Sequence, residues 1–281
     1  MRRETRGETT RETGRETADH REEKRIANQT ATAYDAIYGS LLAYVRRWGR
    51  ICSLVEAHAR TREARILEVG CGTASFLAEM EKRGHTRLYG CDLSARTLEL
   101  ARRKAPGARL AAADMLAMPY RDGSIDLVIF MGSLHHVEEL EEALREGFRA
   151  LRDSGTLLIF EGDEDFFAAR PALPLRIFYK ILRRKNAGRK RRCPIDPDDP
   201  QYYSEHHRQR SERDYIAAAG PFGTHRGTAR FEVLTAVFEG VLFTESRLDR
   251  WIYAMLARLD AARAKRPGRR AQMLLAFHKR R

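Results

Sequence analysis

The middle of the chain alternates between short apolar runs and longer segments with helical spacing. Five apolar runs have the length of strands buried on both faces: residues 65–69, 87–91, 109–113, 125–131 and 156–160. Between them, apolar residues recur every three or four positions, as in 137–151, and Ser94 can cap the helix that follows it. This alternation predicts an α/β fold, a doubly wound, Rossmann-like sheet that is mostly parallel and has helices on both faces.

Both flanks of this alternating core have different patterns. Residues 1–26 repeat Arg-Glu-Thr with almost no apolar content, so we expect a disordered, charged N-terminal segment. Residues 26–58 have helical spacing and predict helices before the first strand.

Beyond residue 162 the pattern predicts an insertion followed by the end of the sheet. A polar, basic insertion is expected over about 163–230. Apolar runs at 231–243 and 271–279, on either side of an amphipathic helix, are expected to be strands six and seven. Residues 27–281 are thus interpreted as one domain with a core over 60–162, the insertion, and a C-terminal part over 231–281.

The stretch "RILEVGCGTASFL", residues 65–77, contains the candidate ligand site. Gly70 and Gly72 follow the first strand, where a doubly wound sheet binds its ligand and where glycine permits positive φ and close approach. A dinucleotide fingerprint requires a third glycine where Ser75 stands, and Glu68 would repel a pyrophosphate. The same carboxylate would attract the ammonium and sulfonium groups of S-adenosylmethionine.

In their order along the chain, these residues resemble the class I S-adenosylmethionine-dependent methyltransferases, in particular the methyltransferase type 11-like, small-molecule branch. "LEVGCGTASF" is similar to the family's E-x-G-x-G motif, "YGCDLS" and "AAADMLAMPY" to its two nucleoside-binding segments, and "SIDLVIFMGSLHHV" to its fourth strand and exit loop. The resemblance implies an enzyme with S-adenosylmethionine as its cofactor and a seven-stranded sheet.

The resemblance also assigns roles to particular residues. Asp92 would accept hydrogen bonds from the ribose hydroxyls, Leu93 would pack on the adenine, and Asp114 would bind its amino group, with Met115 and Met131 as further contacts. The segment "ATAYDAIYGS" is similar to a helix that covers the cofactor, which would make Tyr34 part of that cover. The alternatives are that the acids are helix caps or surface groups and that Tyr34 is a core aromatic.

Three histidines are candidates for a catalytic base. His135 and His136 follow the fourth strand, where the acceptor should lie, and imidazole titrates near neutrality. His206, in "QYYSEHHRQRSERD", is a third candidate because this part of the chain commonly contributes to the acceptor pocket in the family. The alternatives are that the first pair only shapes its loop and that His206 belongs to a polar loop.

The formal net charge of +13 is concentrated outside the alternating core. Residues 170–192 hold ten Lys or Arg and no acid, and residues 247–281 hold eleven against two acids. In the first segment Arg176, Lys180, Arg183 and Arg184 share one helix face and Leu175, Phe178, Tyr179 and Leu182 another. This is the pattern of a helix on an anionic membrane, although phosphate contacts with RNA or a solvated lid would also explain it.

These observations lead to one principal expectation and two alternatives. We expect methyl transfer to a small, apolar or lipid-like organic acceptor at O, C or N, with peripheral membrane contact through residues 173–192 and nucleic acid as the less favoured partner. The alternatives are an RNA methyltransferase and a catalytically inactive protein that binds S-adenosylmethionine. The four cysteines have no metal-ligand spacing, so no metal is expected. Without a long apolar run or a signal sequence, a cytoplasmic location is expected.

Overall fold

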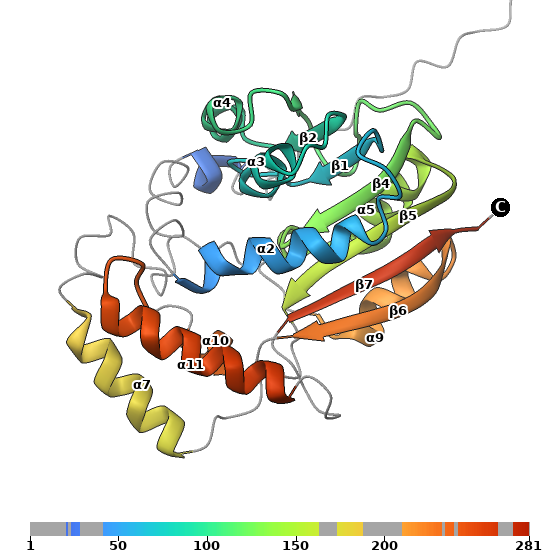
Figure 1. The fold of residues 1–281 in the computed structure, drawn as a ribbon. Coiled ribbons are helices and arrows are strands. Elements are labelled where there is room, and N and C mark those ends of the chain that lie inside the picture. Colours follow the sequence, from blue (N-terminus) through green and yellow to red (C-terminus); the bar gives the residue numbers. More distant parts are fainter. Residues whose placement is uncertain are drawn as a thin grey trace, which may run out of the picture.

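A seven-stranded sheet forms the centre of the protein (Figure 1). The computed structural model describes residues 21, 24–28, 42–162, 173–187, 210–231, 234–238, 241–263 and 272–280. The strands are β1 (Ile66–Val69), β2 (Leu88–Asp92), β3 (Arg109–Ala112), β4 (Ile125–Met131), β5 (Leu151–Gly162), β6 (Gly223–Phe231) and β7 (Gln272–Lys279). Their order is β3-β2-β1-β4-β5-β7-β6. The first five are parallel, and β7 is antiparallel to both β5 and β6, which confirms the expected, mostly parallel Rossmann-like fold.

Helices cover both faces of the sheet. The helices α2 (Leu42–Glu56), α3 (Ser75–Lys82) and α4 (Ala95–Lys104) share a core with one face, to which Ile66 contributes. The helices α5 (Leu140–Ala150) and α9 (Glu212–Ala219) share a core with the other face, to which the adjacent Leu67 contributes. Because successive residues of a strand point to opposite faces, an uninterrupted apolar run supplies both cores. The helix expected within 137–151 begins at Leu140.

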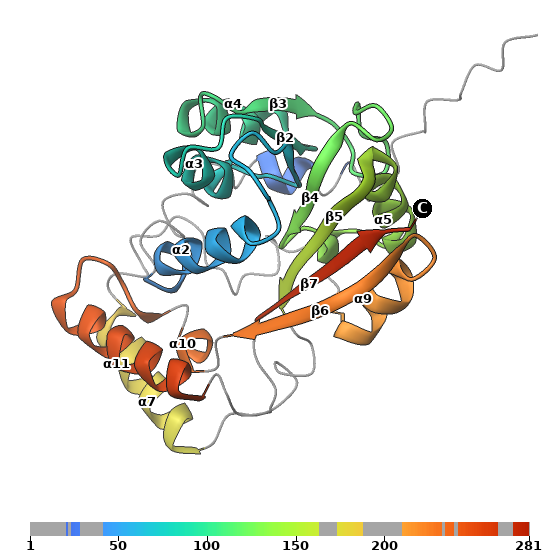
Figure 2. The same cartoon turned by 45° about the vertical axis from the view of Figure 1, so that its right-hand side comes forward.

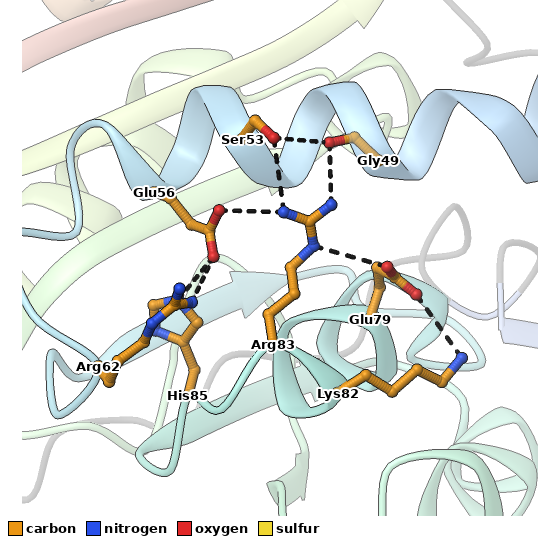
Figure 3. Close-up of polar contacts among 8 residues, drawn as sticks. All are labelled: Gly49, Ser53, Glu56, Arg62, Glu79, Lys82, Arg83 and His85. Atoms are coloured by element: carbon orange, nitrogen blue, oxygen red, sulfur yellow. Dashed lines mark hydrogen bonds and ion pairs between the residues drawn. The ribbon is translucent and has the colours of Figure 1, made fainter.

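An ionic cluster attaches α2 to the end of α3 (Figure 3). Arg83, which follows α3, donates to Glu56 Oε2 at 3.0 Å and to the carbonyl oxygen of Gly49 at 3.1 Å. Burial opposes ionisation of Glu56, but the hydrogen bond from Arg62 and the charge of Arg83 lower the pKa of this carboxyl overall. The cluster fixes α2 beside the helix that follows the glycine turn.

The helices α7 (Leu173–Lys185), α10 (Leu234–Val237) and α11 (Arg247–Arg263) form a separate unit at one end of the sheet (Figures 1 and 2). Their shared core contains Leu182, Phe238 and Ile252, with Phe178 and Tyr179 packed against it. The apolar side of α7 that the sequence suggested for a membrane therefore faces other helices. None of the helices in the described ranges has the length and apolar content needed to cross a bilayer.

The sixth strand lies in a different place from the one expected. The apolar run 231–243 was interpreted as this strand, but β6 is Gly223–Phe231, and Leu234–Val237 form α10. As the edge strand, β6 pairs only with β7 in the described sheet and keeps several side chains in solvent, so it has a polar sequence. The apolar run is instead needed for the core beneath α7 and α11.

Candidate cofactor and acceptor site

The predicted site residues of the core lie at the carboxyl ends of the parallel strands. Glu68 is within β1, and Gly70 and Gly72 follow it. Asp92 is the last residue of β2 and Met131 the last of β4. Two predicted residues, Tyr34 and His206, lie outside the described residues, as does most of the N-terminal segment 1–26.

The two glycines of the turn have different structural requirements. Gly70 has a φ of +69°, and a Cβ at this position would lie 2.5 Å from Cβ of Ser133 in the loop after β4. Gly72 has a φ of +51°, and a Cβ there would have no atom within 4 Å. We expected both glycines to leave room for a ligand, but Gly70 is required by packing, and only Gly72 faces open space.

Glu68 places a buried carboxylate beside this turn. Its side chain is 3% exposed, and Oε2 has no hydrogen-bond partner among the described residues. Burial and the nearby charge of Asp92 raise the pKa of Glu68, against the Leu77 backbone N–H and the charge of Lys104. A buried carboxylate with one oxygen left unpaired favours a ligand that brings a positive charge.

Asp92 connects the glycine turn to the end of β2. Its Oδ2 accepts the backbone N–H of Gly72 at 2.8 Å, and Oδ1 accepts that of Ser94 at 2.9 Å. Burial raises the pKa of Asp92, and the two backbone donors offset only part of this effect. Each carboxylate oxygen has a second lone pair, so Asp92 can also accept hydroxyl groups of a ligand.

Three further hydrogen bonds, at the glycine turn and at the loop after β2, were not predicted from the sequence. The Nζ of Lys104, in the last turn of α4, donates to Thr73 Oγ1 and Ser75 Oγ, both at 3.0 Å. Ser94 Oγ donates to Asn28 Oδ1 at 2.6 Å, so the helical segment 24–28 lies against the loop after β2.

The remaining expected cofactor contacts lie around the same edge. Leu93 is partly exposed directly after Asp92. Asp114 follows β3, and its Oδ1 accepts the backbone N–H of Leu116 at 2.9 Å. Met115 Cε lies 3.9 Å from the position that a Cβ would take on Gly70, so this side chain borders the glycine turn. Contact of these residues and Met131 with a cofactor stays a prediction.

A buried carboxylate at the end of β5 holds one of the two adjacent histidines. His135 and His136 end a short 3-10 helix, Leu134–His136. The Nδ1 of His135 lies 2.8 Å from Glu161 Oε2, and Glu161 Oε1 accepts the backbone N–H of Leu134 at 2.8 Å. Burial opposes ionisation of Glu161, but His135, the Leu134 backbone N–H and the charge of His136 together outweigh it, so the pKa of Glu161 is lowered. The ionised carboxylate can only accept, which makes His135 Nδ1 the donor.

His136 lies beside His135 in the loop after β4, and Arg210 contacts this loop from a distant part of the chain. The ring centroids of His136 and His135 are 4.2 Å apart, and the charge of His136 lowers the pKa of both Asp92 and Glu161. Arg210 donates to the carbonyl oxygen of Leu134 at 2.7 Å and also to that of Val137. Arg210, which sequence reasoning missed, therefore fixes the loop that holds the histidines.

These features fit S-adenosylmethionine. Glu68 offers a carboxylate for the cationic end, Asp92 has lone pairs for the ribose hydroxyls, and the open space at Gly72 leaves its backbone accessible. The His135–Glu161 pair lies at the neighbouring strand ends, where it can act on an acceptor.

Comparisons with known proteins agree with this assignment. The model of the family described as "Methyltransferase domain" matches residues 67–159. A demethylmenaquinone methyltransferase of Chlorobaculum tepidum is 27% identical over 168 residues, which are 59% of this chain and 69% of that protein. A probable tRNA methyltransferase 9B of Mus musculus is 33% identical over 98 residues, which are 34% of this chain and 21% of that protein. The chain thus spans only part of these curated relatives.

The fold also matches solved structures. A structure from Thermotoga maritima, described as a methyltransferase dependent on S-adenosylmethionine and possibly a histamine N-methyltransferase, has a TM-score of 0.56 and 18% identity. The match covers 92% of this chain and 100% of that one, which establishes the shared fold. The family match over residues 67–159, the fold and the site together support a class I S-adenosylmethionine-dependent methyltransferase.

Proposed function

We propose that the protein transfers a methyl group to a small, apolar or lipid-like organic acceptor, with His135 as the proton acceptor. The observation that carries this proposal is the 2.8 Å contact between His135 Nδ1 and the buried carboxylate of Glu161. A carboxylate in this position fixes the tautomer and the orientation of the imidazole, as in other acid–base pairs.

In this proposal, some residues of the chain orient the cofactor and another accepts the proton of the acceptor. When bound, S-adenosylmethionine supplies an electrophilic methyl group on a sulfonium that becomes neutral as the methyl leaves. Glu68 and Asp92 orient the cofactor, and alignment of the reacting groups supplies much of the rate. An acceptor that begins as O–H or N–H must lose its proton. His135 can take it at Nε2, because Nδ1 is the donor to Glu161.

Two observations favour an organic acceptor over RNA. Several relatives are named demethylmenaquinone methyltransferases, and the acceptor suggested by that name is lipid-like. The loop after β4 reads "MGSLHHV", without the N-P-P-Y segment of many nucleic-acid amino-methyltransferases. The RNA alternative is supported by the relatives named probable tRNA methyltransferase 9B and by the net charge of +13.

Transfer of a tritiated methyl group to separated lipid, RNA and water-soluble extracts tests the acceptor class. We expect label in the lipid or small-molecule fraction. Label in RNA alone would overturn the proposal, and cofactor binding without any transfer would identify a regulatory protein.

Two substitutions then test the role of the pair. His135→Asn should lower kcat by about 10²-fold, the lower range for general-base catalysis, with the cofactor Kd unchanged. Glu161→Gln should lower kcat less, because the amide oxygen can still accept from Nδ1, although the negative charge and the acceptor for the Leu134 N–H are lost. His225→Asn, on the edge strand β6, is the matched control. Full kcat in His135→Asn would exclude the proposed base.

A further inference from the structure

The exposed apolar side chains of the described residues are confined to two neighbouring helices. Every large hydrophobic side chain that is exposed in this part of the chain belongs to α7 or α11: Leu173, Ile177, Ile181, Leu248, Trp251, Met255 and Leu259. Trp251 is 64% exposed and Ile177 51%. The two helices lie side by side in both views (Figures 1 and 2) and share one core. Such a concentration of exposed apolar groups marks an interaction surface.

Each helix presents these side chains as a continuous stripe. On α7 the exposed residues are four positions apart, and on α11 they are three or four apart, so each set spans roughly 80° of helix circumference. Leu182 of α7 and Ile252 and Leu256 of α11 already fill the core between the helices. The stripes are therefore additional to the apolar groups needed for folding, and we call them together the α7–α11 surface.

The charges that face solvent on these two helices are all positive. The two acids of α11 are buried: Asp249 accepts Lys185 Nζ at 2.8 Å, and Asp260 accepts the backbone N–H of Leu234 at 2.9 Å. The α7 helix contains no acid. The exposed basic residues include Arg176, Lys180 and Arg184 on α7 and Arg247, Arg250 and Arg258 on α11.

We propose that the α7–α11 surface docks on an anionic lipid bilayer, with Ile177 and Trp251 among the side chains that enter the interface. Apolar stripes beside basic residues are the arrangement by which helices lie on anionic membranes, and tryptophan favours the membrane interface. RNA is a weaker fit, because six of the seven exposed apolar side chains are not aromatic and cannot stack on bases. Docking does not depend on the identity of the methyl acceptor.

Trp251 reports directly on this docking. The chain has two tryptophans, and Trp48 is partly buried against Phe76, with ring centroids 6.5 Å apart. In the full chain with Trp48→Phe, emission therefore arises from Trp251 alone. Vesicles of phosphatidylcholine with phosphatidylglycerol should shift this emission to the blue, brominated lipid should quench it, and phosphatidylcholine alone should have little effect. Vesicle binding without a change in Trp251 would show that another segment binds and would overturn the proposal.

Sedimentation with the same vesicles tests the two contributions separately. Ile177→Ser with Trp251→Ser should abolish most of the binding. Arg176→Gln with Lys180→Gln should lower the partition coefficient roughly 30-fold, as expected for two basic residues. Arg102→Gln with Arg103→Gln, an equal loss of charge on α4, should leave it almost unchanged. Thermal melting verifies that each variant folds.

Three further results would overturn the proposal. One is equal sedimentation of the Ile177→Ser, Trp251→Ser variant and the wild type. A second is a Trp251 shift produced by an RNA duplex and not by vesicles, which would assign the surface to nucleic acid. The third is a dimer of the wild type in light scattering that is absent in the Ile177→Ser, Trp251→Ser variant, together with no change in Trp251 emission on addition of vesicles. This result would assign the surface to a second copy of the chain.

Discussion

Glu68→Gln is expected to stabilise the cofactor-free protein and to weaken its binding of S-adenosylmethionine. The wild-type carboxylate is 3% exposed, and its Oε2 has no partner among the described residues. Because burial raises the pKa of Glu68, the native carboxyl keeps a proton that the unfolded chain has lost, so the fold loses stability progressively as the pH rises above the unfolded value of about 4.3. The amide removes this effect, which is worth about 1–3 kcal/mol at neutral pH for one unsatisfied buried group.

The same substitution should have the opposite effect on binding. A cationic ligand beside Glu68 favours the carboxylate, so binding to the wild type releases a proton and tightens as the pH rises. The amide cannot ionise and forfeits about 1.5–3 kcal/mol for a charged hydrogen bond, which raises Kd by roughly 10- to 150-fold. Titration calorimetry in two buffers of different ionisation enthalpy measures both Kd and the protons released.

Thermal melting across pH measures the stability effect, with Glu99→Gln as the control. Glu99 is an exposed carboxylate on α4 that pairs with Arg96, and its amide should change neither melting nor binding appreciably. The reasoning would be refuted if Glu68→Gln lowered the Tm at neutral pH, or if it bound the cofactor with the wild-type Kd and the same proton release.

Four further substitutions test the glycine turn and the start of β4. Asp92→Ala removes the acceptor of two backbone N–H groups and should raise the cofactor Kd at least tenfold in calorimetry, with a lower Tm; an unchanged Kd would contradict its assigned role. Gly70→Ala should cost about 2–5 kcal/mol in chemical denaturation, because positive φ and a 2.5 Å approach combine, whereas Gly72→Ala should cost only about 1–2 kcal/mol; equal losses would contradict the packing argument. Burial opposes ionisation of Asp126, but hydrogen bonds from Arg65 lower its pKa overall, so Asp126→Asn should cost about 1 kcal/mol at neutral pH. The difference in stability between Asp126→Asn and the wild type should vanish as the pH falls through the lowered pKa of Asp126. Urea unfolding midpoints across pH measure this difference, and midpoints of the two proteins that fall in parallel down to low pH would argue against the reasoning.

The central strands could be predicted from the sequence because both of their faces are buried. The run that contains β1 is apolar apart from Glu68, and helices cover both sides of it. The edge strand β6 has no such signature, because Thr224 and Arg226 face solvent. Hydrophobicity alone therefore favoured the run 231–243 as the sixth strand. Apolar residues of this run instead pack in the core beneath α11.

In the site, the sequence identified residues at strand ends but not the residues that hold them. Asp92 is the last residue of the apolar run that forms β2, and the turn with Gly72 follows the neighbouring strand β1. The alternation of strands and helices therefore places both at the same edge of the sheet. Glu161 contacts His135 across 26 residues, and Arg210 contacts Leu134 across 76. Such pairings depend on how distant segments pack, and the local pattern carries no signal for them.

The position of β7 constrains how the chain can assemble. β7 is the last strand in the sequence, yet it lies between β5 and β6. During synthesis, β6 emerges before β7, the strand with which it pairs. The edge of β5 also stays unpaired until β7 has been synthesised. The five parallel strands can associate earlier, whereas completion of the sheet is a late, long-range event that leaves two unpaired edges exposed to aggregation until Gln272–Lys279 leave the ribosome.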